Sequence, residues 1–145
     1  MKLVCLDIDC VCNTAESRDT GENFNNLDPA CVARVSKICE LTGAKILITS
    51  SWRKYLTLEE LTSRLRSSGL TAEIVGITPV LDHRERGDEI KAWFKKAQEP
   101  VEAFVILDDD DDMGNLFSHL VKTADSLLDE HVEEALRILN GPSNT

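Results

Sequence analysis

Two short apolar runs in this chain each end in aspartates, and this pattern limits the folds that the chain can adopt. Residues 2–9 read KLVCLDID, and residues 103–112 read AFVILDDDDD. Apolar runs of this length fit strands that are buried on both faces, as in a parallel sheet. Burying an unpaired carboxylate costs several kcal/mol or makes the group take up a proton. Acids at the ends of two core strands therefore need a compensating partner.

The segments between and around these runs alternate between strand and helix patterns. Asp28 and Pro29 are typical of a helix start and Gly43 of a helix end, while Thr57 with Glu60 forms the pattern of a capping box. Further helices are predicted from about Gly87 to Ala97 and around Val132, Leu136 and Leu139. Strands are predicted at 2–7, 44–51, 72–79, 102–113 and, in short form, 119–123.

Strands that alternate with helices at this spacing predict an α/β fold. We expect a single doubly wound, Rossmann-like domain over residues 1–145, with a mainly parallel sheet of about five strands and helices on both faces. In such a sheet the ligand site lies beyond the carboxyl ends of the strands, where the strand order reverses. The aspartates stand at two of these strand ends.

Charge and cysteine content narrow the class of protein. The net charge of −10 gives no general attraction to nucleic acid or to an anionic membrane, so phosphate binding must be local. No apolar stretch approaches the ~20 residues of a membrane span, and no signal-peptide pattern stands at the N-terminus. The five cysteines form no CxxC pair and predict reduced, mostly buried thiols of a soluble cytoplasmic protein, with a metal role for Cys10 and Cys12 as the minor alternative.

The two acidic clusters together predict a metal site. A run such as Asp108 to Asp112 is, by itself, typical of a solvated loop. Adjacent parallel strands lie ~5 Å apart, however, so Asp7 with Asp9 and the second cluster can face one cation. A hard divalent ion with oxygen ligands offsets the repulsion between carboxylates, and Mg²⁺ binds a few carboxylates together with water and a substrate phosphate.

These residues resemble the haloacid dehalogenase (HAD) superfamily of phosphohydrolases. The DxD motif that begins this family's pattern is matched by Asp7 to Val11, and the Thr or Ser that ends its next strand is matched by Thr49, with Ser50 as the nearby alternative. VILDDDDDM matches the acidic fourth motif. More narrowly, LDIDCVCNT, SSWRK, GITP and RGDEI resemble the HAD domains of Swiss Army knife RNA repair proteins.

The resemblance implies a role for each acid. Asp7 would be the nucleophile that forms an aspartyl-phosphate, and Asp9 the general acid and then the general base. Asp108 would be the main carboxylate ligand of Mg²⁺, together with Asp7 and the backbone carbonyl of Asp9. Asp112 matches a second acid of the fourth motif, and Asp109 is the competing candidate.

The resemblance also implies groups that hold the phosphate. Thr49 would donate a hydrogen bond to a phosphoryl oxygen. The cation of the third motif is assigned to Arg86, with Lys91 and Arg84 as alternatives and a plain surface charge as the competing interpretation of each. Arg53 follows the phosphate-binding strand, so it is a candidate for holding substrate, with a purely structural role as its alternative.

Two departures from the family pattern affect these expectations. Cys10 replaces the usual Gly at a position where the chain turns and a Cβ is disfavoured, so an altered loop geometry or activity is expected. The segments 9–28 and 52–86 are too short for a separate cap domain, so we expect an open site. Specificity would then come from the polar loop 13–26 together with Arg53 and Lys54.

The leading hypothesis is a Mg²⁺-dependent phosphatase that acts on a phosphorylated substrate, with nucleic-acid ends or nucleotides as candidates. A two-metal nuclease also gathers acids at strand ends, but it needs neither a nucleophilic Asp nor Thr49. A non-catalytic interaction domain that retains the fold is the third possibility, since a fold does not entail an activity.

Overall fold

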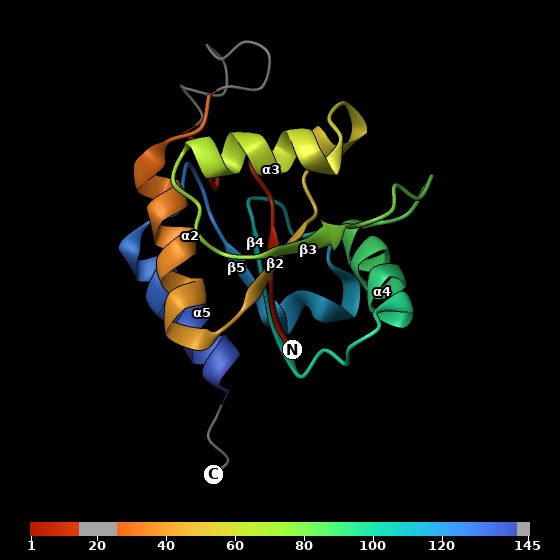
Figure 1. Cartoon of the computed structure of the whole chain (residues 1–145). Coiled ribbons are helices and arrows are strands. Elements are labelled where there is room, and N and C mark those ends of the chain that lie inside the picture. The colour runs from red at the N-terminus through yellow and green to blue at the C-terminus, as the bar shows by residue number, and fades with distance from the viewer. Residues whose placement is uncertain (15–25, 142–145) are drawn as a thin grey trace.

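The computed structural model describes residues 1–14 and 26–141 as a five-stranded sheet with helices on both faces (Figure 1). The strands are all parallel and lie in the order β3-β2-β1-β4-β5. Their bounds are β1 Lys2–Leu6, β2 Lys45–Ile48, β3 Ile74–Ile77, β4 Ala103–Asp108 and β5 Leu120–Lys122. All five predicted strands are present, including the short fifth one, and the predicted α/β fold is confirmed.

Two of the helices have the capping residues that the sequence predicts. Asp28 accepts a hydrogen bond from the Ala30 N–H at 2.9 Å, and Gly43 ends that helix in a left-handed conformation with φ 77°. Thr57 and Glu60 form the predicted capping box. The helices are α2 Pro29–Thr42, α3 Leu58–Ser67, α4 Arg86–Lys96 and α5 Asp129–Asn140, and two unpredicted 3₁₀ helices are η1 Ser51–Lys54 and η2 Gly114–His119.

Alternate residues of the central strands point to opposite faces of the sheet and build two apolar clusters. Val4 and Leu6 of β1 join the larger cluster, to which α2, α3 and α5 contribute. Leu3 and Cys5 join the smaller cluster, to which α4 and η2 contribute. Helix α4 accordingly lies on the opposite side of the sheet from α2 and α5 (Figure 1).

The strand order reverses between β1 and β4. The chain builds β1, β2 and β3 outward on one side and then returns to place β4 on the other side of β1. Leu6 of β1 pairs with Leu107 of β4, so these two strands end side by side. The reversal therefore brings together the two strands that precede the acidic clusters.

The cysteines and the segments between the strands agree with the sequence-based expectations where the structure describes them. All five cysteines are buried and none forms a disulfide. Within residues 1–14 and 26–141, no separate cap domain stands between the elements of the sheet, and no helix has the length and apolar character needed to cross a membrane. The polar loop 13–26 falls largely on residues 15–25, which lie outside the described part.

Candidate active site

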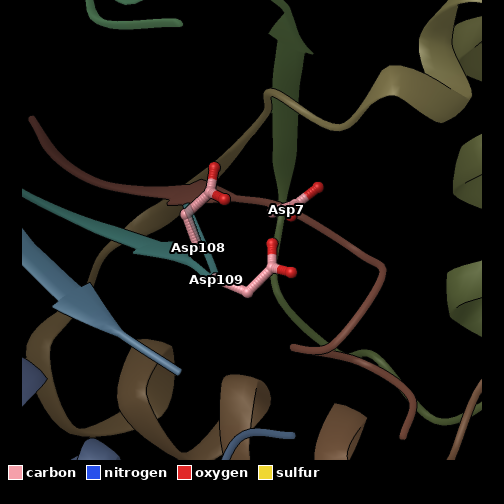
Figure 2. A group of neighbouring side chains, drawn as sticks. All are labelled: Asp7, Asp108 and Asp109. Atoms are coloured by element: carbon pink, nitrogen blue, oxygen red, sulfur yellow. The ribbon is translucent and has the colours of Figure 1, made fainter. Parts of the chain in front are cut away.

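Three carboxylates meet where β1 and β4 end. Asp7 directly follows β1, Asp108 is the last residue of β4, and Asp109 comes next along the chain. One oxygen from each of the three lies within 4.8 Å of the others, and Figure 2 shows the side chains drawn together beside the two strand ends. The Asp7 N–H donates to the Leu107 carbonyl at 3.0 Å, which extends the ladder between the strands up to the acids.

Burial makes this cluster costly to ionise. Asp108 is fully buried and Asp7 is 5% exposed. Burial and the neighbouring charge of Asp108 raise the pKa of Asp7 well above its usual range, although Arg86 acts in the opposite direction. Burial also raises the pKa of Asp108, again against the effect of Arg86. The site therefore holds carboxylates that need positive charge in order to stay ionised together.

Arg86, the first residue of α4, supplies part of that charge. Its Nη1 lies 2.6 Å from Asp108 Oδ2 and 3.4 Å from Asp7 Oδ1. Burial opposes the charge of Arg86, but the charges of Asp7 and Asp108 outweigh burial and raise its pKa. One guanidinium offsets only one of the three carboxylate charges of the cluster.

The donor set of the cluster fits a hard divalent cation. Asp7, Asp108 and Asp109 offer only oxygen ligands, as Mg²⁺ prefers. Residues 1–14 and 26–141 contain all five cysteines, yet no cysteine belongs to this metal-ligating group. Burial raises the pKa of the Cys12 thiol well above its usual range, which disfavours the thiolate that a metal would require.

The acidic loop after β4 also holds the start of α4 in place. Asp112 Oδ2 accepts a hydrogen bond from the Arg86 N–H at 3.3 Å, and the Asp112 carbonyl accepts one from the Gly87 N–H at 3.1 Å. A Cβ at position 87 would lie 2.2 Å from the Met113 carbonyl oxygen, so this close approach requires glycine. Asp112 thus acts on the cluster by fixing the helix that carries Arg86, and its Oδ1 has no hydrogen-bond partner among the described residues.

Asp9 lies in a turn that two other side chains stabilise. The buried Asn13 donates from Nδ2 to Asp9 Oδ1 at 3.1 Å and accepts the Cys10 N–H at 2.8 Å. Cys10 is left-handed with φ 64°, as the family's glycine would allow, and its carbonyl accepts a 2.7 Å hydrogen bond from Thr123 Oγ1. The sequence predicts a role for Asn13 only as part of the specificity loop 13–26, and its contacts give it a structural role in this turn, for which an Asn shortly after a DxD motif is a signal.

Thr49 directly follows β2, the neighbour of β1. Its N–H donates to the Leu6 carbonyl at 3.0 Å, and its buried Oγ1 has no partner among the described residues. A buried hydroxyl without a partner is uncommon and suits a ligand contact. The Ser50 Oγ, in contrast, accepts a hydrogen bond from the Trp52 N–H at 3.1 Å and caps η1.

Arg53 uses every donor of its side chain inside the protein. Its Nε donates to the Thr78 carbonyl, and Nη1 donates to the carbonyls of Thr49 and Ser50. Nη2 donates to the Pro79 carbonyl at 3.3 Å and to Glu89 Oε1 at 2.7 Å. A guanidinium has five N–H donors, so a substrate contact by Arg53 would require one of these hydrogen bonds to break.

The alternative cations lie in different surroundings. Arg84 lines a cavity that is also lined by Arg86 and Asp112. Lys91 lines another cavity, on α4, that neither Arg86 nor Asp112 lines. Of the three candidates, Arg86 is the one whose guanidinium contacts the acid cluster.

The chain belongs to a known class of HAD domains. The family model for the HAD domain in Swiss Army Knife RNA repair proteins matches residues 3–132, which includes both strand ends, Thr49, Arg86 and the acidic run. A comparison with curated proteins gave no match. The chain is therefore a member of this HAD family, and the acid cluster lies within the matched residues.

Proposed function

We propose that this protein is a Mg²⁺-dependent phosphohydrolase that works through an aspartyl-phosphate on Asp7. The observation that carries the proposal is the meeting of Asp7, Asp108 and Asp109 at the β1 and β4 ends, with Arg86 in contact with two of them. Membership of the HAD family supports it.

In the first step, a carboxylate oxygen of Asp7 attacks phosphorus and the bond from phosphorus to the ester oxygen breaks. Asp9, held by Asn13, gives its proton to the leaving oxygen. In the second step, Asp9 takes a proton from water as the water oxygen attacks the phosphorus of the aspartyl-phosphate. The Asp7 carboxylate is restored and inorganic phosphate leaves.

Two further side chains would bind the phosphoryl group. The Thr49 hydroxyl, which has no partner within residues 1–14 and 26–141, is suited to donate to a phosphoryl oxygen. The Arg86 guanidinium would stabilise negative charge on the transferring group, because phosphoryl transfer depends mainly on positioning and on charge stabilisation.

Mg²⁺ fits the oxygen donors of this site. Asp7 and Asp108 would hold it together with the Asp9 carbonyl and either Asp109 or Asp112. When bound, Mg²⁺ neutralises charge on the phosphoryl group and on the acid cluster.

The candidate substrates are nucleotides or the phosphorylated ends of nucleic acids. The described residues form no cap that would enclose a small metabolite, and the matching family occurs in RNA repair proteins. Both observations favour a phosphate on a larger molecule.

The proposal is tested by phosphate release and by trapping of the intermediate. Phosphate release that requires Mg²⁺, together with an acid-stable ³²P label on the protein that is absent in Asp7→Asn, is the expected result. Cleavage of phosphodiesters without any labelled protein would favour the nuclease. Neither activity, in protein that binds Mg²⁺, would favour a non-catalytic interaction domain.

A further inference from the structure

A small cavity adjoins the acid cluster. Its volume is about 280 Å³, and Arg86 and Asp112 belong both to its lining and to the surroundings of the cluster. Helix η1 contributes Lys54, and the segment before α4 contributes residues 80–84. Arg86, which contacts Asp7 and Asp108, therefore connects this cavity to the acid cluster.

Basic side chains are concentrated around this cavity. It is lined by four of the protein's 16 lysines and arginines, namely Arg53, Lys54, Arg84 and Arg86, although the net charge of the whole chain is −10. Arg53 and Arg86 are already paired with Glu89 and with the acid cluster. Lys54 and Arg84 are exposed, and in residues 1–14 and 26–141 neither side chain forms an ion pair or a hydrogen bond.

Two of the three acids that line the cavity already accept hydrogen bonds from the protein. Glu89 Oε1 accepts from Arg53, and its Oε2 accepts the Leu81 N–H at 2.9 Å. Asp112 uses one oxygen to hold the start of α4. Asp82 is exposed and is the carboxylate that competes most directly with an anion for Lys54 and Arg84. The lining therefore has two exposed cations without ion pairs, against the exposed Asp82 and the buried Oδ1 of Asp112, which has no hydrogen-bond partner among the described residues.

The backbone beside Arg84 has an unusual conformation. His83, which also lines the cavity, is left-handed with φ 59°. This conformation costs a residue with a Cβ about 1–2 kcal/mol, and strained residues cluster at active sites and ligand-binding sites. The strain supports a binding role for the segment 80–84.

We propose that this cavity binds a second phosphate of the substrate, through Lys54 and Arg84, while the first phosphate lies at Asp7. This inference rests on the proposed phosphohydrolase function and specifies its substrate class. The second phosphate can be that of a bisphosphorylated nucleoside or the phosphodiester next to a terminal phosphate. At about 280 Å³ the cavity is slightly smaller than the ~300–1,000 Å³ typical of small-molecule sites, which suits a phosphate group rather than a whole nucleotide.

The test compares substrates that differ only in the second phosphate. A nucleoside 3′-monophosphate, a 5′-monophosphate, the 3′,5′-bisphosphate and a 3′-phosphorylated dinucleotide are hydrolysed at equal Mg²⁺. Compounds with a second phosphate should have a kcat/KM at least about tenfold higher than the monophosphates, since hydrogen bonds to charged groups are among the strongest. The bisphosphate and the dinucleotide distinguish the two sources of that phosphate.

Variants then assign the preference to the cavity. Lys54→Ala and Arg84→Ala should each lower the ratio of kcat/KM between bisphosphate and monophosphate by about tenfold. Lys37→Ala is the matched control, because it removes an exposed lysine of α2 that does not line the cavity, and it should keep the ratio of the wild type. The assignment would be overturned if both cavity variants kept the preference of the wild type for the bisphosphate. It would also be overturned if the wild type had the same kcat/KM for all four substrates.

A binding measurement separates this inference from the proposed function. Asp7→Asn is titrated calorimetrically with the bisphosphate and the monophosphate in Mg²⁺, with and without Arg84→Ala. Tighter binding of the bisphosphate that depends on Arg84 supports the second-phosphate site even if the wild type releases no phosphate. Equal binding of both compounds overturns it even if the wild type hydrolyses monophosphates.

Discussion

At the scale of single residues, Asp7 lowers the stability of the metal-free protein. Burial and Asp108 raise its pKa above the unfolded value, so folding favours the protonated form. The free energy of unfolding therefore falls as the pH rises above about 3.9, the usual pKa of an Asp in an unfolded chain. It stops falling once the pH exceeds the raised pKa of Asp7 in the folded protein.

Asp7→Asn removes that penalty together with the proposed nucleophile. We expect complete loss of turnover, with a melting temperature in EDTA that is equal to or higher than that of the wild type. Thermal unfolding at several pH values and a phosphate-release assay check both parts. Turnover by the variant would show that Asp7 is not the nucleophile.

Asp108 is the residue on which the response to Mg²⁺ should depend. An ion that binds only the folded protein stabilises it by about 2.7 kcal/mol when present at 100 times its Kd. We expect Mg²⁺ to raise the melting temperature of the wild type and Asp108→Ala to lose most of that rise. Asp111→Ala is the control, because Asp111 is exposed and does not belong to the acid cluster. An unchanged response in Asp108→Ala would place the metal elsewhere.

At the scale of elements, the start of α4 is fixed against the acidic loop at Gly87. Gly87→Ala would bring a Cβ within 2.2 Å of the Met113 carbonyl oxygen, so α4 or the loop must move. We expect a loss of about 1–3 kcal/mol of stability, as for other overpacked sites, and a kcat at least about tenfold lower because Arg86 moves with the helix. Kinetics and urea unfolding measure the two effects. A destabilised variant with normal kcat would indicate that the position of Arg86 does not matter for catalysis.

Arg53 joins η1, the segment after β3 and α4 through one guanidinium. Arg53→Lys keeps the charge but removes the planar arrangement of five donors. We expect a loss of about 1–3 kcal/mol of stability, because buried carbonyls that accept from Arg53 lose their donors, with KM changed little in the protein that remains folded. Arg84→Lys, at an exposed position, should keep the stability of the wild type. Unchanged stability with a raised KM in Arg53→Lys would instead support the direct substrate contact considered from the sequence.

The elements were predictable to different degrees. Apolar runs and capping residues predict the presence of every strand and α-helix, because period and capping are local properties of the sequence. The bounds are less exact: the strand predicted at 102–113 ends at Asp108. The helices η1 and η2 were missed because 3₁₀ helices this short carry no amphipathic period. The roles of Gly87 and Glu89 depend on contacts between segments far apart in the chain, which no local pattern contains.

At the scale of the whole molecule, the absence of a cap among the described residues bears on substrate size. We expect phosphate release from a 3′- or 5′-phosphorylated oligonucleotide in preference to small phosphomonoesters. Because the net charge is −10, binding to the oligonucleotide should be weak and should fall steeply with added salt. The measurement compares both substrate types at equal Mg²⁺ over a range of salt. Turnover of one small metabolite without turnover of oligonucleotides would contradict the expectation.

The central position of β1 and β4 has a consequence for amide hydrogen exchange. Strand β1 pairs on both sides with β2 and β4, whereas β3 and β5 are the edges of the sheet. Backbone N–H groups of the centre of a sheet exchange with solvent mainly by global unfolding, and those of the edges exchange through local opening. Local opening of β3 or β5 would thus leave Asp7 and Asp108 close together, because both are attached to inner strands. The acid cluster should therefore persist until the whole domain unfolds.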